Sequence, residues 1–514
     1  MSTTDDLILL LRNLGFDEFT ELQEAILARI EEICINVKSR GAVGDGVTDD
    51  TVAIQTVIDL GAKVYIPAGE FLTSGLTYTN NLDMYGAGED LTTLKLANDA
   101  TGGILAGTLG VIGSTGEPVT ALTLSGMTFD GDQLNNTAGT GALALLHAYA
   151  CARVRVRCVR FTNGVGYGAG FQGHPSNVSA EKRGPITDVR FDSCEFINNG
   201  YYQGVSTSAD GIDVKDSERI TLIDCFASGN SDKGFNLRGR FITLEGCRSY
   251  SNGIGYDFNS HNDPALGRAA DSYIQAVSCT AKGNIGAGFA ATATENSITY
   301  AQFIGCDGID NGGSGLNVNT PPLTGKVRLI VIGGNYNYNT LRGLGLSGAE
   351  DVRAIGVVTR YNAGDGVRTD GILNGAFFAL RSEDNGAFGF RINTTSSINL
   401  VGGSYANNTS GALTGVGFRI SGNPIGVAST ITSAATISIT ARSRPLVTVT
   451  GSVTVTSIDA TYAGDEVTLL FGSTAQLTDG SNLKLVGDFV GGATRVIRLI
   501  CDGTNWLEVS RSIT

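Results

Sequence analysis

Two short segments of the sequence carry carboxylates at a spacing suited to acid–base catalysis. Asp210 and Asp213 stand in the segment Asp210-Gly-Ile-Asp213-Val, and Asp232 follows Asp210 by 22 residues. Two carboxylates about 5–8 Å apart are the arrangement with which glycoside hydrolases cleave glycosidic bonds. Crowding raises the pKa of one such group, which then acts as a general acid beside an ionised general base. This chemistry needs a fold that brings residues 22 apart to neighbouring positions.

A repeat of about 23 residues predicts such a fold. Cysteines and asparagines recur along the chain, and short alternating runs such as Ile220-Thr-Leu-Ile-Asp lie between them. These runs predict strands with one buried face. Strands stacked coil on coil form a parallel β-helix, in which the repeated asparagines and cysteines make internal ladders. Coils about 4.8 Å apart would bring Asp210 close to Asp232. Six cysteines are each followed five residues later by an asparagine: Cys158/Asn163, Cys194/Asn199, Cys225/Asn230, Cys247/Asn252, Cys279/Asn284 and Cys306/Asn311.

Three coils are longer than the repeat and predict loops beside the carboxylates. The extra residues are roughly 167–185, 200–209 and 257–269, at one place in the coil between the Asn-Gly turn and the next strand. Insertions at one position of a solenoid stack on one side, so these loops either wall a substrate groove or make contacts between subunits. His147, in an apolar stretch, is interpreted as a packing residue. The candidate catalytic residues are Asp210, Asp213, Asp232, Asp257, His174 and His261, and the candidate substrate-binding residues are Tyr201, Tyr202, Lys215, Lys233, Arg238, Arg183 and Tyr256.

Composition narrows the class of protein. The chain has 514 residues, 71 glycines but only 9 prolines, and a hydrophobic share of 42%, which argues against disorder. A net charge of −14 argues against nucleic acid as a partner. No apolar window is long enough for a membrane span, and the first residues lack the basic region of a secretory signal. Neither a metal site nor a cofactor is expected.

The pattern changes at both ends of the repeat. Residues 1–34 predict short helices with one apolar stripe, which either cap the β-helix or bundle with other copies. The β-helix itself is predicted over residues 35–424, with a capping segment at 35–75. Residues 425–514 alternate Thr, Ser and Val between turns, which predicts strands outside the repeat. The expected fold is therefore all-β.

Two segments resemble known families and add detail to this fold. Gly41-Ala-Val-Gly-Asp-Gly-Val-Thr-Asp-Asp-Thr51, followed by Val64-Tyr-Ile-Pro-Ala-Gly-Glu-Phe71, resembles the opening of the pectate-lyase-like superfamily, which implies a right-handed β-helix. The stretch from Thr461 to Trp506 resembles a C-terminal module of phage tailspike and tail-fibre proteins. That resemblance implies a sandwich that assembles the chain into a homotrimer.

The carboxylate segments resemble a third family. Ser208-Ala-Asp-Gly-Ile-Asp-Val214 and Asn230-Ser-Asp-Lys-Gly-Phe235 are similar to segments of polygalacturonase-type, family 28, glycoside hydrolases. The resemblance implies that Asp210 and Asp232 are acid and base of an inverting hydrolysis. Ser231 replaces one aspartate of the family's Asp-Asp pair, and no histidine stands where its Gly-His-Gly segment would fall. The repeats also resemble those of mannuronan C5-epimerases, without their Asp-Pro-His-Glu motif.

These observations favour a tailspike depolymerase that hydrolyses a bacterial surface polysaccharide: capsule, exopolysaccharide or O-antigen. Such a protein would sit in the tail of the virion as a homotrimer, with its N-terminus meeting a baseplate or tail protein. Two alternatives stay open. A lyase or epimerase acting on a uronate-containing glycan would use a base and a cation from the same region. A glycan-binding spike without turnover would use its tyrosines to stack on sugars.

Overall fold

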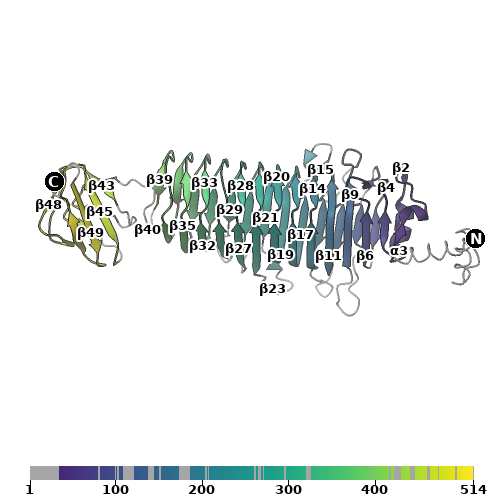
Figure 1. The fold of residues 1–514 in the computed structure, drawn as a ribbon, viewed down its shortest axis with the longest axis horizontal. Helices are drawn as coiled ribbons and strands as arrows, with labels where there is room; N and C mark the ends of the chain where they lie inside the picture. The colour runs from purple at the N-terminus through teal and green to yellow at the C-terminus, as the bar shows by residue number, and fades with distance from the viewer. Residues whose placement is uncertain are drawn as a thin grey trace, which may run out of the picture. The chain divides into compact units, whose positions relative to one another are not determined.

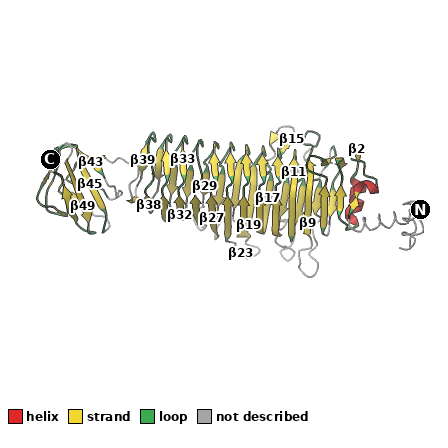
Figure 2. Cartoon of the chain, viewed as in Figure 1, coloured by secondary structure: helices red, strands yellow, loops and turns green. Residues whose placement is uncertain are grey.

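The chain is almost entirely β structure in the part that is described (Figure 2), and it divides into two units, residues 1–270 and 271–514. The predicted N-terminal helices lie outside the described residues. The computed structural model describes residues 34–78, 81–98, 100, 103–107, 121–136, 144–149, 152–172, 186–202, 205–206, 208–259, 262–263, 268–269, 271–293, 297–319, 326–394, 396–415, 418–421, 430–439, 446–459, 463–472, 474–492 and 495–512.

The first unit is a parallel β-helix whose coils contribute strands to three faces, A, B and C (Figure 1). Face A contains β1 (Ile35–Asn36), β3 (Val64–Ile66), β6 (Leu82–Gly86), the first halves of β9 (Ala121–Asp130) and β11 (Arg153–Thr162), β13 (Ile186–Asp192), and the second halves of β17 (Ile212–Ile223) and β19 (Lys233–Glu245). Face B contains β2 (Asp45–Asp49), β4 (Gly69–Thr73), β7 (Thr92–Leu96), the second halves of β9 and β11, β14 (Glu195–Ile197), β18 (Phe226–Ser228) and β20 (Arg248–Tyr250). Face C contains β5 (Leu76–Tyr78), β8 (Leu105–Gly107), β10 (Leu146–Tyr149), β12 (Ala169–Gln172), the first halves of β17 and β19, and β21 (Ile254–Asn259).

The second unit repeats the same three-faced coil. Its face A contains β24 (Ser272–Val277), β27 (Ile298–Ile304), β30 (Lys326–Ile332), β32 (Ala349–Ile355), β35 (Asn374–Phe378), β38 (Ile398–Val401) and β40 (Phe418–Ser421). Its face B contains β25 (Thr280–Lys282), β28 (Asp307–Ile309), β33 (Val358–Arg360) and β36 (Arg381–Glu383). Its face C contains β26 (Phe289–Thr292), β29 (Leu316–Asn319), β31 (Leu344–Ser347), β34 (Val367–Asp370), β37 (Phe388–Ile392) and β39 (Gly411–Thr414). The fold confirms the predicted right-handed parallel β-helix.

An internal asparagine ladder holds successive coils in register. Asn199 donates its side-chain amide to Asn230 Oδ1 at 3.0 Å, and Asn230 donates in the same way to Asn252 at 2.9 Å. Each Oδ1 also accepts the backbone N–H of the preceding asparagine. The second unit repeats these bonds from Asn284 to Asn408. The buried amides are thus hydrogen-bonded, as burial of polar groups requires.

The first predicted step of the two ladders is one residue out of register. Arg160 pairs with Glu195, so Val159 and not Cys158 stands beside Cys194. Likewise, Gly164 and not Asn163 donates its N–H to Asn199 Oδ1 at 3.0 Å. Cys158 instead stands at the left-handed corner of the coil that Ser193 occupies one coil later, with φ values of 50° and 54°. The other predicted ladder cysteines, Cys194, Cys225, Cys247, Cys279 and Cys306, are buried free thiols, as expected for stacked small side chains.

The capping segment places its aspartates in turns. Helix α3 (Thr51–Asp59) begins after Asp50, whose side chain makes no capping hydrogen bond to the helix. Asp50 instead accepts backbone N–H groups of Val43 and Gly44, which fixes the preceding loop. Asp49 accepts the N–H of Thr51 at 2.9 Å, so it still supports the first helical turn.

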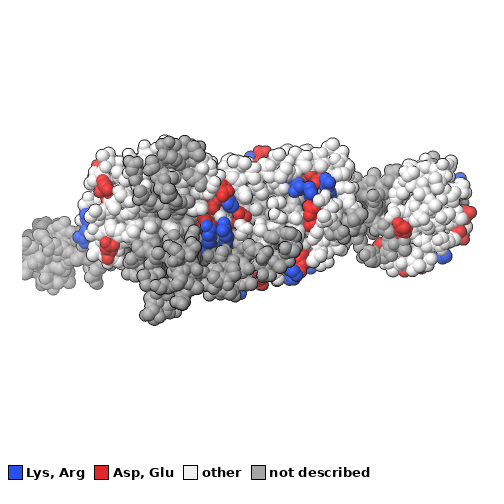
Figure 3. All heavy atoms as spheres, turned by 180° about the vertical axis from the view of Figure 1, so that it is seen from behind, with Lys and Arg blue, Asp and Glu red and all other residues white. Residues whose placement is uncertain are grey.

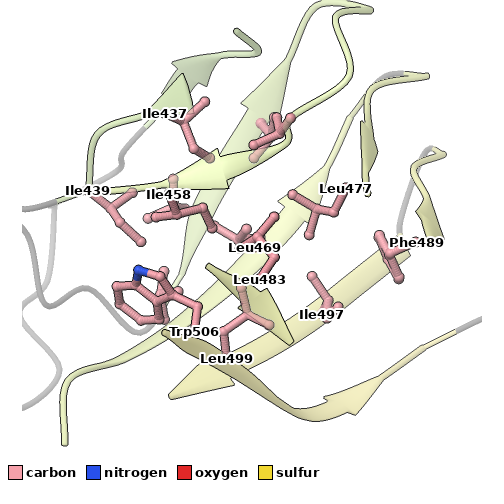
Figure 4. Close-up of a cluster of buried hydrophobic side chains, with 14 of the residues drawn as sticks. Ile437, Ile439, Ile458, Leu469, Leu477, Leu483, Phe489, Ile497, Leu499 and Trp506 are labelled. Atoms are coloured by element: carbon pink, nitrogen blue, oxygen red, sulfur yellow. The ribbon is translucent and has the colours of Figure 1, made fainter. Parts of the chain in front are cut away.

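The C-terminal part of the second unit has its own core. Buried side chains from a six-stranded sheet and two short ribbons meet around Trp506 and Leu469 (Figure 4). No helix in the described ranges is long and apolar enough to span a bilayer. The sheet contains β41 (Thr430–Thr432), β43 (Val447–Thr450), β45 (Glu466–Phe471), β47 (Leu483–Lys484), β49 (Arg495–Cys501) and β50 (Trp506–Arg511), and the ribbons pair β42 (Thr436–Ile437) with β44 (Ser457–Ile458) and β46 (Gln476–Leu477) with β48 (Phe489–Val490).

Candidate active site

Face C of the first unit carries a column of polar residues in strand register. Gly170 on β12 pairs with Asp213 on β17, Asp213 pairs with Asn236 on β19, and Asn236 pairs with Asp257 on β21. Asp213 stands between two core residues, so the alternation of a strand directs its side chain away from the core. The coil therefore does bring distant acidic residues to one face, where they are buried.

Asp210 lies immediately before β17 and is 2% exposed. Its Oδ1 accepts the backbone N–H of Lys233 at 2.9 Å, and its Oδ2 accepts the side-chain amide of Asn236 at 2.8 Å. Burial is the main cause that raises the pKa of Asp210 to about 6, against the lowering effect of Lys233, and the nearby Asp213 raises it further. Asp210 is therefore protonated for part of the time near neutral pH.

The backbone bond of Asp210 is a property of the coil, because the second unit contains the same bond. Asp365 precedes glycine in the same way and accepts the backbone N–H of Phe388 at 3.1 Å. What distinguishes Asp210 is the bond from the Asn236 side chain to its second oxygen, together with the nearby charges of Lys233 and Asp213. Gly211, which follows Asp210, has no room for a side chain, since a Cβ there would lie 2.7 Å from Gly234 O.

Lys233 joins Asp210 to Asp232. Lys233 Nζ lies 2.6 Å from Asp232 Oδ2 and 3.8 Å from Asp210 Oδ1, which together place these two oxygens within about 6.4 Å of each other. The sequence predicts Asp232 at the coil position of Asp210, but Lys233 occupies that position, because Phe235 pairs with Ile212. Asp232 stands one residue earlier, and its side chain is 33% exposed.

Asp213 and Asp257 are both buried carboxyl groups next to cations. Asp213 Oδ2 lies 2.8 Å from Lys215 Nζ, whereas its Oδ1 has no hydrogen-bond partner within the described part of the chain. Burial is the main cause that raises the pKa of Asp213, and Lys215 opposes it. Burial also raises the pKa of Asp257, against the effect of Lys233 and Arg238. Figure 3 shows basic and acidic side chains gathered side by side in a few places on one face.

Two residues near this column were missed as candidates by the sequence analysis. Lys215 Nζ lies 6.0 Å from the centre of the Tyr167 ring, and burial raises the pKa of that half-buried tyrosine, with Asp213 adding to the rise. His147 pairs in register with Gly170, and burial followed by Lys215 lowers its pKa to about 4. It is therefore neutral at pH 7. The register of β10 with β12 and β17 identifies His147, and the contact with Lys215 identifies Tyr167.

The tyrosines predicted to bind substrate differ in where they lie. Tyr256 is buried in the core, with its ring stacked 4.9 Å from Phe235, so the prediction that it binds substrate is wrong. Its strand position, in register with Phe235, directs it inward. Tyr201 is half-buried in the ribbon of β15 (Tyr201–Tyr202) with β16 (Val205–Ser206). Tyr202 belongs to this ribbon, but its side chain lies outside the described part, as do His174, Arg183 and His261.

The insertions do not all occur at one position of the coil. Residues 173–185 follow β12 and residues 260–271 follow β21, whereas residues 200–209 precede β17. Because β12, β17 and β21 are neighbouring strands of face C, the insertions adjoin both ends of that face. A second short ribbon, β22 (Asn262–Asp263) with β23 (Arg268–Ala269), lies in the last of them. No group of three metal-ligating side chains occurs among the residues that the structure describes.

Comparison with known proteins gives three kinds of similarity. Residues 34–268 match the family described as rhamnogalacturonase A/epimerase, pectate lyase-like. A mannuronan C5-epimerase of Azotobacter vinelandii is 39% identical over 121 residues, which are 20% of this chain and 11% of the epimerase. The pre-neck appendage protein of Bacillus phage phi29 is 26% identical over 267 residues, which are 48% of this chain and 30% of that protein.

A solved structure shares the fold at low sequence identity. Tailspike protein 3 of bacteriophage CBA120 aligns with a TM-score of 0.54 and 13% identity, covering 79% of this chain and 64% of the tailspike. The chain spans about a tenth of the epimerase and under a third of the phage appendage protein. The coils, the capping segment and the family match agree for residues 34–268, which are similar to the pectate-lyase-like family and form part of a right-handed parallel β-helix.

Proposed function

We propose that the chain is a phage tail depolymerase that hydrolyses glycosidic bonds of a bacterial surface polysaccharide. The similarity to a pre-neck appendage protein supports a place in the virion tail, and the family match supports a polysaccharide as substrate. The observation that carries the hydrolytic assignment is the pair Asp210 and Asp232 held on either side of Lys233.

In this proposal Asp210 is the general acid and Asp232 the general base. With its pKa near 6, Asp210 carries a proton that it transfers to the glycosidic oxygen as the bond to the sugar breaks. The Asp232 carboxylate takes a proton from the attacking water. After the transfer, the ammonium of Lys233 and the amide of Asn236 stabilise the new Asp210 carboxylate.

The separation of the two carboxylates bears on the stereochemistry. Inverting glycosidases hold their carboxyl groups about 6.5–9.5 Å apart, which leaves room for a water molecule. Asp210 Oδ1 and Asp232 Oδ2 lie at most about 6.4 Å apart, which is below that range. Inversion, which the family 28 resemblance implies, therefore requires the one-third-exposed Asp232 to turn outward from Lys233 when substrate binds.

The neighbouring charges provide substrate-binding roles. Lys215 and Arg238 lie beside Asp213 and Asp257 and are suited to hold carboxylates or hydroxyls of a glycan. Tyr201 lies in the ribbon that precedes β17, where a ring can stack on a sugar. We further propose that the C-terminal sandwich assembles a homotrimer, for which light scattering should give three times the mass of one chain. The N-terminal segment is proposed to meet the phage tail.

A uronate lyase or epimerase is a second candidate, favoured by His147 and Tyr167. Both reactions begin when a base removes the proton next to a uronate carboxylate whose charge a cation neutralises. His147 is neutral at pH 7 and close enough to Lys215 for its pKa to be affected by it, and Tyr167 lies under the same lysine. These are a base, an acid and a cation on one face. The similarity to a mannuronan C5-epimerase supports this reading.

One experiment separates the candidates. Purified bacterial polysaccharides, alginate and polygalacturonate are incubated with the wild type, with Asp210→Asn and with the matched control Asp365→Asn. Hydrolysis predicts new reducing ends without ultraviolet absorbance, loss in Asp210→Asn, and full activity in Asp365→Asn. New ultraviolet absorbance from an unsaturated uronate would select the lyase, and a changed uronate configuration in an intact polymer would select the epimerase. Binding without any product would leave a glycan-binding spike.

A further inference from the structure

Three arginines gather on face C of the second unit. Arg368 on β34 pairs directly with Arg391 on β37, and Arg342 precedes β31, whose residue Gly345 pairs with Arg368. Like charges in register on neighbouring strands destabilise a sheet unless an opposite charge compensates them. In a chain with a net charge of −14, such a cluster of cations is conspicuous.

The acidic residues nearby compensate this cluster only in part. Arg368 Nε lies 3.3 Å from Asp370 Oδ2, yet this buried nitrogen has no hydrogen-bond acceptor in the described ranges. Asp365 is 4% exposed and already accepts the N–H of Phe388. Arg391 lies over the Phe388 ring at 5.8 Å. Within the part of the chain that is described, no carboxylate is within ion-pair distance of Arg342 or Arg391.

The chain makes room for the Arg342 guanidinium. A Cβ built on Gly345 would lie 3.5 Å from Arg342 Nη1, 3.1 Å from Asn317 Oδ1 and 3.3 Å from Ser314 Oγ. The guanidinium therefore lies over Gly345, beside two side chains that can hydrogen-bond a ligand. Burial lowers the pKa of Arg342, and the charge of Arg368 lowers it further. An anion bound here would relieve that repulsion.

We propose that Arg342, Arg368 and Arg391 bind carboxylates of an acidic polysaccharide, at a site in the second unit separate from the candidate active site. A guanidinium binds a planar carboxylate through two parallel hydrogen bonds, and neighbouring strands about 4.8 Å apart present such groups in a row. The choice of a polysaccharide rests on the proposed function, whereas the preference for a carboxylate rests on the arginines alone.

Binding is measured in the Asp210→Asn background, so that the candidate active site does not consume the probe. The probes are a galacturonate hexamer and the same hexamer with every carboxylate converted to its methyl ester. Arg342→Ala with Arg391→Ala is expected to weaken binding of the acid hexamer at least tenfold. Arg353→Ala, an exposed arginine on β32, serves as the matched control and is expected to leave binding unchanged. The ester is expected to bind weakly to all variants.

Three results would overturn the proposal. The first is that the double variant binds the acid hexamer as tightly as Asp210→Asn alone does. The second is that Asp210→Asn binds the acid and the ester hexamer equally well. The third is that it binds inorganic phosphate but not the hexamer. If the double variant does not fold, Arg342→Gln alone carries the test. Because no turnover is involved, a failure of hydrolysis elsewhere leaves this result standing, and a failure here leaves the hydrolase proposal intact.

Discussion

Replacing Asp210 by asparagine tests the buried acid through stability as well as activity. The pKa of Asp210 is raised from 3.8 to about 6, mainly by burial. The folded state therefore holds this proton more tightly than the unfolded chain does. The resulting stabilisation is fully present below about pH 4 and is lost as the pH rises through about 6. At 1.36 kcal/mol for each pKa unit, the loss is about 3 kcal/mol.

Asparagine keeps the shape of this side chain but does not titrate. The wild-type free energy of unfolding, measured by denaturant titration, should fall relative to the variant by about 3 kcal/mol between about pH 4 and about pH 7. Hydrolysis should fall by about 10²- to 10⁴-fold, as expected on removal of a general acid. Identical pH dependence of unfolding in both proteins would refute the burial argument. Full activity in the variant would remove Asp210 from the mechanism.

Three further changes test other parts of the molecule. Lys233→Met removes the cation next to the general acid, so the pKa of that acid rises and the alkaline limb of the pH–rate profile moves to higher pH. Asn311→Ala leaves buried hydrogen-bonding groups unpaired and should cost at least about 2 kcal/mol in chemical unfolding, against under about 1 kcal/mol for the exposed Asn335→Ala. Leu469→Ala should cost about 2–5 kcal/mol. The unfolding transition followed by the fluorescence of Trp506, the single tryptophan, should move to lower denaturant concentration. The denaturant concentration at which half of the enzymatic activity is lost should stay unchanged.

The repeat made the coil predictable because the repeated residues, the ladder asparagines above all, have partners of the same type in the next coil. A buried amide such as Asn230 must meet an equivalent amide one coil away, so spacing alone reveals the ladder. The prediction failed by one residue at Cys158 and Asn163, which are five residues apart like the ladder pairs but stand at the left-handed corners that Ser193 and Asn198 occupy in the next coil. Spacing alone therefore does not show which of two adjacent coil positions a residue occupies.

The candidate site was predicted less completely than the coil, because spacing again left an error of one residue. Asp210 and Lys233 share one position in successive coils, and the 22-residue spacing of Asp210 and Asp232 concealed the difference of one residue. Tyr256 has an aromatic ring like Tyr201, but its strand register directs it into the core. His147 and Tyr167 belong to no repeated spacing. Only the pairing of β10, β12 and β17 brings His147 near Lys215, and only the folded coil brings the Tyr167 ring to that lysine.

The asparagine ladder also constrains how such a chain can diversify. Each amide oxygen accepts bonds from the coil before it, so one added residue between two ladder positions would displace the later coils from their partners. Changes of length are therefore tolerated where the chain has left the ladder, next to the strands of face C. Insertions and deletions there can accordingly remodel what surrounds the carboxylates while the interior of the coil keeps its hydrogen bonds.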